Sequence, residues 1–285
     1  DDEARTISHA LARDGEVVPE GGRPGGAARL GVDYETLRKI NPRLVYCSIS
    51  GYGQDGPYRN RVGHDVNYLG FAGVIGLTGT AGGPPAIPGV QIADIGGGAL
   101  MAAVGILAAL WAREETGQGQ FVDIGMMDGA VAWQVIHTFR HLLDQQEPER
   151  GDTLLTGHHP CYAIYETKDG RHVTVGALEP HFWRTLCERI GLPEYGAKQF
   201  DEGEAREEMF QRFRARFRER TMVDWVTMLA DLDICFGPVA TLSEALADPQ
   251  VRHRQMVVEV QDARGNRQRT LGNPIKLSAT PPTIP

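Results

Sequence analysis

The chain has 285 residues, of which 41% are hydrophobic and 23% charged, a composition typical of globular proteins with one or two domains. Its 37 acidic residues outnumber its 29 basic ones, and the formal net charge of −8 argues against nucleic-acid binding, which requires an excess of Lys and Arg. The four cysteines form no CxxC pair, so we expect no disulfide framework and no zinc knuckle, and we expect a cytoplasmic protein.

The N-terminal third of the sequence predicts an α/β layer. Residues 1–28 are polar and glycine-rich without a periodic pattern, and we expect little stable structure there. Helical spacing over residues 32–40 predicts a helix that Pro42 ends, and residues 44–50 are predicted to form a buried strand. The glycine-rich turn at 51–57 follows that strand directly, where open α/β sheets place their ligands.

A long apolar stretch follows, in which Asp94 is the one charged residue between positions 66 and 112. Such a composition predicts a mostly buried segment. Residues 95–112 just reach the length of a membrane span, but they begin with a glycine triplet and their apolar residues are mainly Ala. We therefore predict a core helix and no membrane partner.

The rest of the chain predicts further short elements and a smaller α+β domain. Lys168, Asp169 and Gly170 form a hairpin turn signal between two strand patterns. The predicted elements are a strand at 121–124, a helix at 126–143, strands at 162–165 and 172–177, and helices at 180–190, 206–219 and 223–232.

Three acidic groups and one histidine stand out as candidates for chemistry. His64 and Asp65 precede an apolar helix pattern, Asp94 precedes the glycine triplet, and Glu179 precedes Pro180. Taken singly, His64, Asp65 and Asp94 are more simply read as helix caps. Burial favours a functional interpretation, because desolvation disfavours the charged form of a carboxylate and thereby tunes an acid or a base.

Seven motifs follow one another along the chain: GYGQDGP (51–57), GHDVNY (63–68), ADIGGG (93–98), GILAALWARE (105–114), GQGQFVDIGMMDG (117–129), YETKDGRHVTVGALEP (165–180) and GPVATLSEALADPQV (237–251). In this order they resemble the class III CoA-transferase superfamily. Within it, GHD at 63–65 and GALEP at 176–180 resemble the α-methylacyl-CoA racemase branch.

The resemblance implies a racemase or epimerase of 2-methylacyl-CoA thioesters that needs no cofactor and no metal. His64 and Asp94 would remove and return the α-proton on opposite faces through an enolate. Glu179 would orient His64, and Asp65 would lie near the thioester oxygen. The residues expected to contact CoA or the substrate are Arg23, Arg29, Gly63, Val66, Asn67, Tyr68, Gly96 and Gly97.

The resemblance also implies a domain organisation: a large doubly wound, Rossmann-like α/β domain that is incomplete at its N-terminus, and a smaller α+β domain. We expect residues 1–19 to be an unmatched, disordered tail. Residues 20–144 would form the large CoA-binding domain, residues 153–261 the small domain, and residues 262–285 would return to the large one. Family members form interlocked homodimers, so a homodimer is implied as well.

Other interpretations stay open at this point. The chain could be a CoA-transferase, in which Asp94 attacks an acyl-CoA to give an anhydride and then an enzyme-bound CoA thioester. It could also be an inactive, truncated fragment. His158, His159 and Cys161 suggest a metal site, but no second ligand cluster accompanies them, so we expect none.

Overall fold

The computed structural model describes residues 2–262 and 264–283, and the chain divides into two compact units, Asp1–His158 and His159–Pro285. Each unit combines helices with a small sheet, which confirms the predicted mixed α/β class. The finer domain limits at residues 19, 144, 153 and 261 stay predictions.

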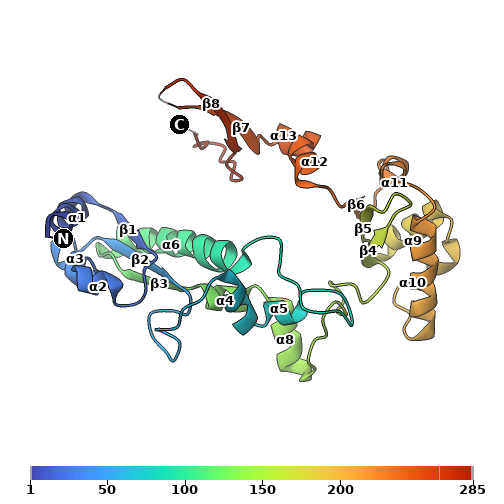
Figure 1. Cartoon of the computed structure of the whole chain (residues 1–285), viewed down its shortest axis with the longest axis horizontal. Coiled ribbons are helices and arrows are strands. Elements are labelled where there is room, and N and C mark those ends of the chain that lie inside the picture. Colours follow the sequence, from blue (N-terminus) through green and yellow to red (C-terminus); the bar gives the residue numbers. More distant parts are fainter. Residues whose placement is uncertain (1, 263, 284–285) are drawn as a thin grey trace. The chain divides into compact units, whose positions relative to one another are not determined.

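The first unit contains a parallel sheet of order β1-β2-β3, with Val17 opposite Val45 and Tyr46 opposite Phe121. Helix α6 contacts β2 and β3 (Figure 1). Three strands do not display the reversal of strand order that defines a doubly wound sheet, so that description stays a prediction. The elements are α1 (Asp2–Asp14), β1 (Val17–Glu20), α2 (Gly26–Leu30), α3 (Tyr34–Ile40), β2 (Val45–Ser50), α4 (Asp65–Phe71), α5 (Val74–Leu77), η1 (Ile92–Leu100), α6 (Met101–Thr116), β3 (Phe121–Gly125), α7 (Met126–Ala132) and α8 (Val135–Asp144).

The expectation of little structure in residues 1–28 is wrong, because this segment contains α1, β1 and α2. Ala12 of α1 is buried against Leu37 of α3. The Asn41 side chain donates hydrogen bonds to the carbonyls of Ala12 (3.1 Å) and Gly15 (2.9 Å). Helix α1 is therefore held by a small apolar contact and by the amide side chain of Asn41. Contacts of this kind produce no strong periodic pattern in the sequence.

The predicted helix at 126–143 is two helices, α7 and α8, separated at Trp133 and Gln134. The Gln134 side chain donates a 2.5 Å hydrogen bond to the carbonyl of Ala72, which follows α4. This hydrogen bond links the end of α7 to the end of α4 at the point where the helix is interrupted. The spacing of apolar residues in the sequence does not reveal such a tertiary contact.

Glycines allow η1 and α7 to approach each other closely. A Cβ atom on Gly97 would lie 2.5 Å from the carbonyl oxygen of Met126, and one on Gly129 would lie 2.3 Å from the Cα atom of Gly97. Neither distance is possible for a real side chain, so both positions require glycine. The contact holds the π-helical η1, which carries Asp94, against α7.

The expectation that residues 66–112 are mostly buried is also wrong. Four residues spaced four, three and four apart form one exposed apolar row along the end of η1 and α6, which we call the α6 stripe. Leu100 is 53% exposed, Val104 64%, Leu107 66% and Trp111 77%. An exposed apolar row of this kind is unfavourable in water and is expected to be covered by a partner. The sequence composition does not identify that partner.

The same helix is apolar enough to raise the question of a membrane. Residues Ile92–Thr116 form one helical run with a mean hydropathy of 1.9 and 22% of its most apolar window buried, which by length and composition alone passes for a membrane span. However, α6 packs on β2 and β3 as a sheet-covering helix does. The absence of a membrane partner stays a prediction.

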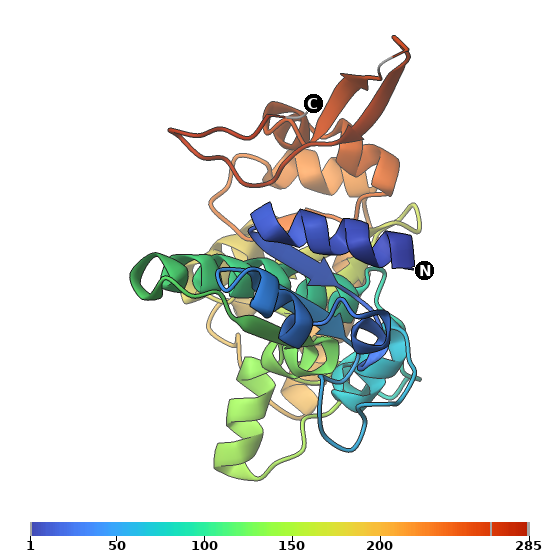
Figure 2. The ribbon, with the colours of Figure 1, turned by 90° about the vertical axis from the view of Figure 1, so that its left-hand side faces the viewer.

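The second unit contains an antiparallel sheet of order β4-β5-β6, and the predicted hairpin is confirmed, with Tyr162 opposite Gly176. The β7–β8 hairpin forms a two-stranded sheet of its own (Figure 2). The elements are β4 (Tyr162–Glu166), β5 (His172–Gly176), α9 (Pro180–Ile190), η2 (Pro193–Tyr195), α10 (Glu204–Phe217), α11 (Met222–Leu229), β6 (Phe236–Pro238), α12 (Leu242–Ala247), α13 (Pro249–His253), β7 (Val257–Gln261) and β8 (Arg267–Leu271).

An aromatic core holds this unit together. Trp183 of α9 stacks on Phe213 of α10 with ring centroids 4.8 Å apart and planes 11° apart. The Trp183 indole N–H donates to the carbonyl of Tyr195 at 2.9 Å, so its one polar group is satisfied inside the core. Leu186 of α9 lies in the same core and is fully buried.

This core predicts the cost of a cavity. We expect Leu186→Ala to lower the free energy of unfolding by about 2–5 kcal/mol, because it removes a fully buried side chain. Leu242→Ala is the matched control, since Leu242 is 76% exposed, and it should change stability by less than about 0.5 kcal/mol. Urea unfolding measures both, and equal losses in the two variants would contradict this description of the core.

Candidate active site

Asp65 joins the beginnings of two helices. It is the first residue of α4 and is 9% exposed. Its Oδ2 atom accepts hydrogen bonds from the backbone N–H groups of Ala93 (2.8 Å) and Asp94 (3.1 Å), both in the first turn of η1. One carboxylate of α4 therefore caps another helix, where the unpaired N–H groups and the helix dipole both favour negative charge.

His64 is the N-cap residue of α4, and its backbone is extended, with φ −127° and ψ 176°. Its backbone N–H donates to Oδ1 of Asn67 at 3.0 Å. The Tyr68 hydroxyl donates to the carbonyl of Gly63 at 2.5 Å. Side chains of α4 therefore hold the backbone of Gly63 and His64 in place. His64 itself is exposed.

Asp94 lies beside both of these groups. As a residue it is exposed, yet partial burial of its carboxyl raises its pKa, and the negative charge of Asp65 raises it further, whereas His64 acts in the opposite sense. The structure therefore brings His64, Asp65 and Asp94 together. The sequence predicted a buried Asp94, but in this chain only part of its carboxyl is shielded from water.

The capping interpretation is confirmed in part. His64 is an N-cap, but the N-cap of η1 is Gln91, and Asp94 lies inside the first turn. Asp65 is a capping group for η1 and not for its own helix. Its Oδ2 atom accepts hydrogen bonds from two backbone amides and so helps to hold η1 in place. Its contact with the thioester oxygen stays a prediction.

The predicted substrate-contacting glycines differ in their surroundings. Gly97 is buried against α7, so the missing side chain there serves helix packing. A Cβ atom on Gly96 would lie 3.0 Å from the indole nitrogen of Trp133. Val66 and Asn67 are exposed at the start of α4. The contact of these residues with CoA or substrate stays a prediction.

Glu179 belongs to the second unit, where it is the exposed N-cap residue of α9 and Pro180 occupies the first helical position. Its carbonyl accepts from the backbone N–H of Trp183 at 3.1 Å, which is ordinary helix initiation. Its predicted action on His64 joins residues of different units and stays a prediction.

Basic side chains surround Gly25 at the carboxyl end of the parallel sheet. A Cβ atom on Gly25 would lie 3.9 Å from Nη1 of Arg29 and 3.7 Å from Nη2 of Arg59. Arg23 lies in the loop between β1 and α2, Arg29 lies in α2, and Arg59 lies in the loop between β2 and α4. A cavity of about 260 Å³ there is lined in part by Gly25, Arg59, Tyr34 and Ser48. Arg59 is a candidate anion-binding residue that the sequence did not identify.

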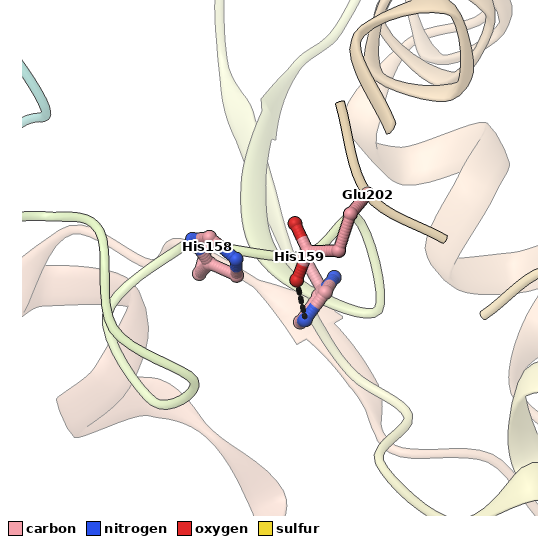
Figure 3. A group of neighbouring side chains, drawn as sticks. All are labelled: His158, His159 and Glu202. Carbon is pink, nitrogen blue, oxygen red and sulfur yellow. Dashed lines mark ion pairs between the residues drawn. The ribbon is translucent and has the colours of Figure 1, made fainter. Parts of the chain in front are cut away.

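His159, the first residue of the second unit, has an acidic neighbour that the sequence did not predict. His159 Nε2 and Glu202 Oε1 form an ion pair at 3.6 Å (Figure 3). Within the described part of the chain, the ligand atoms of His158, His159 and Glu202 all lie within 4.8 Å of one another. Cys161 is buried and does not belong to this group. The absence of a metal stays a prediction.

Comparison with known proteins relates the chain as a whole to enzymes that act on acyl-CoA compounds. Residues 1–285 match the profile of CoA-transferase family III. Human alpha-methylacyl-CoA racemase is 33% identical over 98% of this chain and 72% of its own length, and mouse succinyl-CoA:glutarate CoA-transferase is 32% identical over 89% and 59%. A CAIB/BAIF family protein from Brucella suis has a TM-score of 0.82 and 29% identity over 99% of this chain and 74% of its own.

The position of Asp65 predicts an electrostatic effect on its neighbour. Asp65→Asn keeps an oxygen that can accept from the η1 amides but removes the charge. Because that charge is one cause of the raised pKa of Asp94, we expect this pKa to fall toward its ordinary value in the variant. Carbon-13 NMR titration of the Asp94 carboxyl measures it, with Asp144→Asn, an exposed change on α8, as the control. Identical titrations in wild type and Asp65→Asn would show that Asp65 does not act on Asp94.

Proposed function

This chain belongs to CoA-transferase family III, and we propose that it racemises 2-methylacyl-CoA thioesters by moving the α-proton between His64 and Asp94. The family acts on acyl-CoA substrates. The observation that carries the finer proposal is the Asp65 carboxylate, whose two hydrogen bonds hold the start of η1 beside the start of α4. An imidazole and a carboxyl thereby come from two adjacent helix ends.

The chemistry requires two groups because inversion needs opposite faces. One group removes the proton from the carbon next to the thioester carbonyl, the electron pair moves onto the carbonyl oxygen as an enolate, and the other group delivers a proton to the opposite face. A single base would return the proton to the face it came from. His64 and Asp94 can exchange these tasks, so the reaction runs in both directions.

The raised pKa of Asp94 suits this task. A carboxyl with an ordinary pKa is almost wholly ionised near neutral pH and is a weak proton donor. Raising the pKa increases the fraction that carries a proton and strengthens the carboxylate as a base. Binding of an apolar acyl group over Asp94 would exclude more water and raise the pKa further.

The CoA part of the substrate is assigned to the arginines near Gly25 in the first unit. Arg23, Arg29 and Arg59 supply guanidinium groups that suit the phosphates of CoA. CoA enters as part of the substrate, so no separate cofactor is required. A cytoplasmic location agrees with an acyl-CoA substrate and with four free thiols.

A CoA-transferase is the second candidate. The carboxylate of Asp94 could attack the thioester carbonyl, releasing CoA thiolate and leaving an acyl anhydride on Asp94. The thiolate would then attack the aspartyl carbonyl, giving an enzyme-bound CoA thioester and free acyl carboxylate. Transferase relatives of 32% identity support it, but it gives His64 no direct task.

A homodimer is the third element of the proposal. The α6 stripe, formed by Leu100, Val104, Leu107 and Trp111, repeats at the spacing of helices that pack against a partner. Its exposure costs free energy in water, and a second copy of the chain offers an equal surface.

The two-base reaction predicts a strong dependence on His64. In deuterated water, a (2R)-2-methylacyl-CoA should gain α-deuterium and give the other epimer, and His64→Ala should lower both rates by about 10²- to 10⁴-fold. His253→Ala, a change at an exposed residue of α13, should leave the rates unchanged. Proton NMR and chiral chromatography follow the two products.

Two outcomes would redirect the assignment. Unchanged activity in His64→Ala, together with CoA transfer to a carboxylate acceptor and a trapped adduct on Asp94, would favour the transferase. If a folded protein gives no heat on titration with CoA at high micromolar concentration, both enzyme functions are contradicted.

The α6 stripe predicts the oligomeric state. Wild type should have the mass of a dimer by light scattering, and Leu107→Glu should be monomeric because a charge at the interface opposes apolar packing. Leu242→Glu, on the exposed face of α12, should remain dimeric. A monomeric wild type, or a dimer unaffected by Leu107→Glu, would contradict this part of the proposal.

A further inference from the structure

Tyr52, in the loop after β2, has a polar group that the active-site description does not use. The residue is 8% exposed, and its hydroxyl is fully buried. Within residues 2–262 and 264–283, that hydroxyl has no hydrogen-bond partner. Phenylalanine would fill the same space without leaving a buried polar atom unpaired, so the hydroxyl is costly unless another state of the protein uses it.

Tyr52 lies at the centre of an aromatic cluster, which we define as Tyr52, Tyr58, Tyr68 and Phe71. The ring of Tyr52 meets those of Tyr58, Tyr68 and Phe71 edge-on, at centroid distances of 5.6, 5.2 and 5.9 Å. The guanidinium of Arg61 lies over the Phe71 ring at 4.4 Å and closes the cluster on one side. The ring of Tyr52 is therefore held by packing and has little freedom to turn.

The hydroxyl of Tyr52 lies next to Gly63, the residue before His64. A Cβ atom on Gly63 would lie 3.0 Å from the Tyr52 hydroxyl and 2.8 Å from the Tyr68 ring. The carbonyl of Gly63 already accepts the hydroxyl hydrogen of Tyr68. The residue that precedes His64 thus passes between two buried phenols, one bonded to it and one not.

A carbonyl oxygen has two lone pairs, so Gly63 can accept a second hydrogen bond. A small shift of the 63–64 peptide toward Tyr52 would allow it, and the absence of a side chain on Gly63 leaves space for that shift. Both phenols would then hold the peptide, and the direction of the His64 side chain would be fixed more firmly.

We propose that Tyr52 is a positioning residue for His64, whose hydroxyl donates to the carbonyl of Gly63 when the site is loaded with a CoA compound. This inference rests on the proposed function in one respect, the role of His64 as an acid/base group. The group that would face substrate is His64, and Tyr52 acts through it.

The substitution that isolates the hydroxyl is Tyr52→Phe. We expect kcat for α-proton exchange to fall about five- to tenfold, the effect of losing one hydrogen bond, with KM changed less than about twofold because binding groups are untouched. The melting temperature should stay the same or rise, because an unpaired buried hydroxyl is removed. The matched control is Tyr58→Phe in the same aromatic cluster, which should leave kcat and KM unchanged.

A second readout separates this proposal from the assignment of the reaction. Proton NMR of the His64 ring, recorded with and without CoA itself, reports its placement whether or not the protein is a racemase. We expect CoA to shift the His64 signal in wild type and in Tyr58→Phe, and to shift it less in Tyr52→Phe. If wild type shows no exchange activity, the racemase assignment fails while this comparison still tests Tyr52.

Three results would overturn the inference. The first is a Tyr52→Phe variant with wild-type kcat and a wild-type response of His64 to CoA. The second is a loss of activity matched by Tyr58→Phe, which would make the effect a general one of the aromatic cluster. The third is a loss that follows a lowered melting temperature, which would assign Tyr52 to packing alone.

Discussion

One carboxylate organises the first unit of this protein. Asp65 lies at the start of α4 but uses its Oδ2 atom to bind the first amides of η1, 28 and 29 residues further along the chain. That interaction is favourable because it pairs a buried charge with N–H groups that have no partner within their own helix. It is the polar link between the helix that carries Asp94 and the helix that follows His64, in addition to the packing of both elements on α7. The glycine contact between η1 and α7 fixes the other side of the same segment.

The same carboxylate also contributes to the electrostatics of the site. Partial burial raises the pKa of Asp94, the negative charge of Asp65 raises it further, and His64 acts in the opposite direction. A neighbouring group that positions a residue and tunes its pKa can serve either proton transfer or nucleophilic attack. Racemases and transferases are both among the relatives of this chain, and in the function proposed above His64 is the residue that separates the two chemistries.

The sequence predicted those features that depend on local patterns. The patterns at residues 32–40 and 44–50 indicated a helix and a strand, which the structure places at Tyr34–Ile40 and Val45–Ser50, and the turn at Lys168–Gly170 indicated a hairpin, which is confirmed. The features that it missed depend on distant contacts. Helix α1 is held by Asn41 and Leu37, Arg59 reaches Gly25 through folding of a loop, and Asp65 caps η1 and not α4. Residues 66–112 were predicted to be buried because only one of them, Asp94, is charged. Composition indicates that such a segment avoids water, but it does not show which partner covers it.

The most direct test of the two-base account is a crystal structure of the protein with a 2-methylacyl-CoA bound. The account predicts that an imidazole nitrogen of His64 and a carboxylate oxygen of Asp94 lie within about 3.5 Å of the α-carbon, on opposite faces. If both groups lie on one face, or if either is beyond reach of the α-hydrogen, the proposed proton transfer is contradicted.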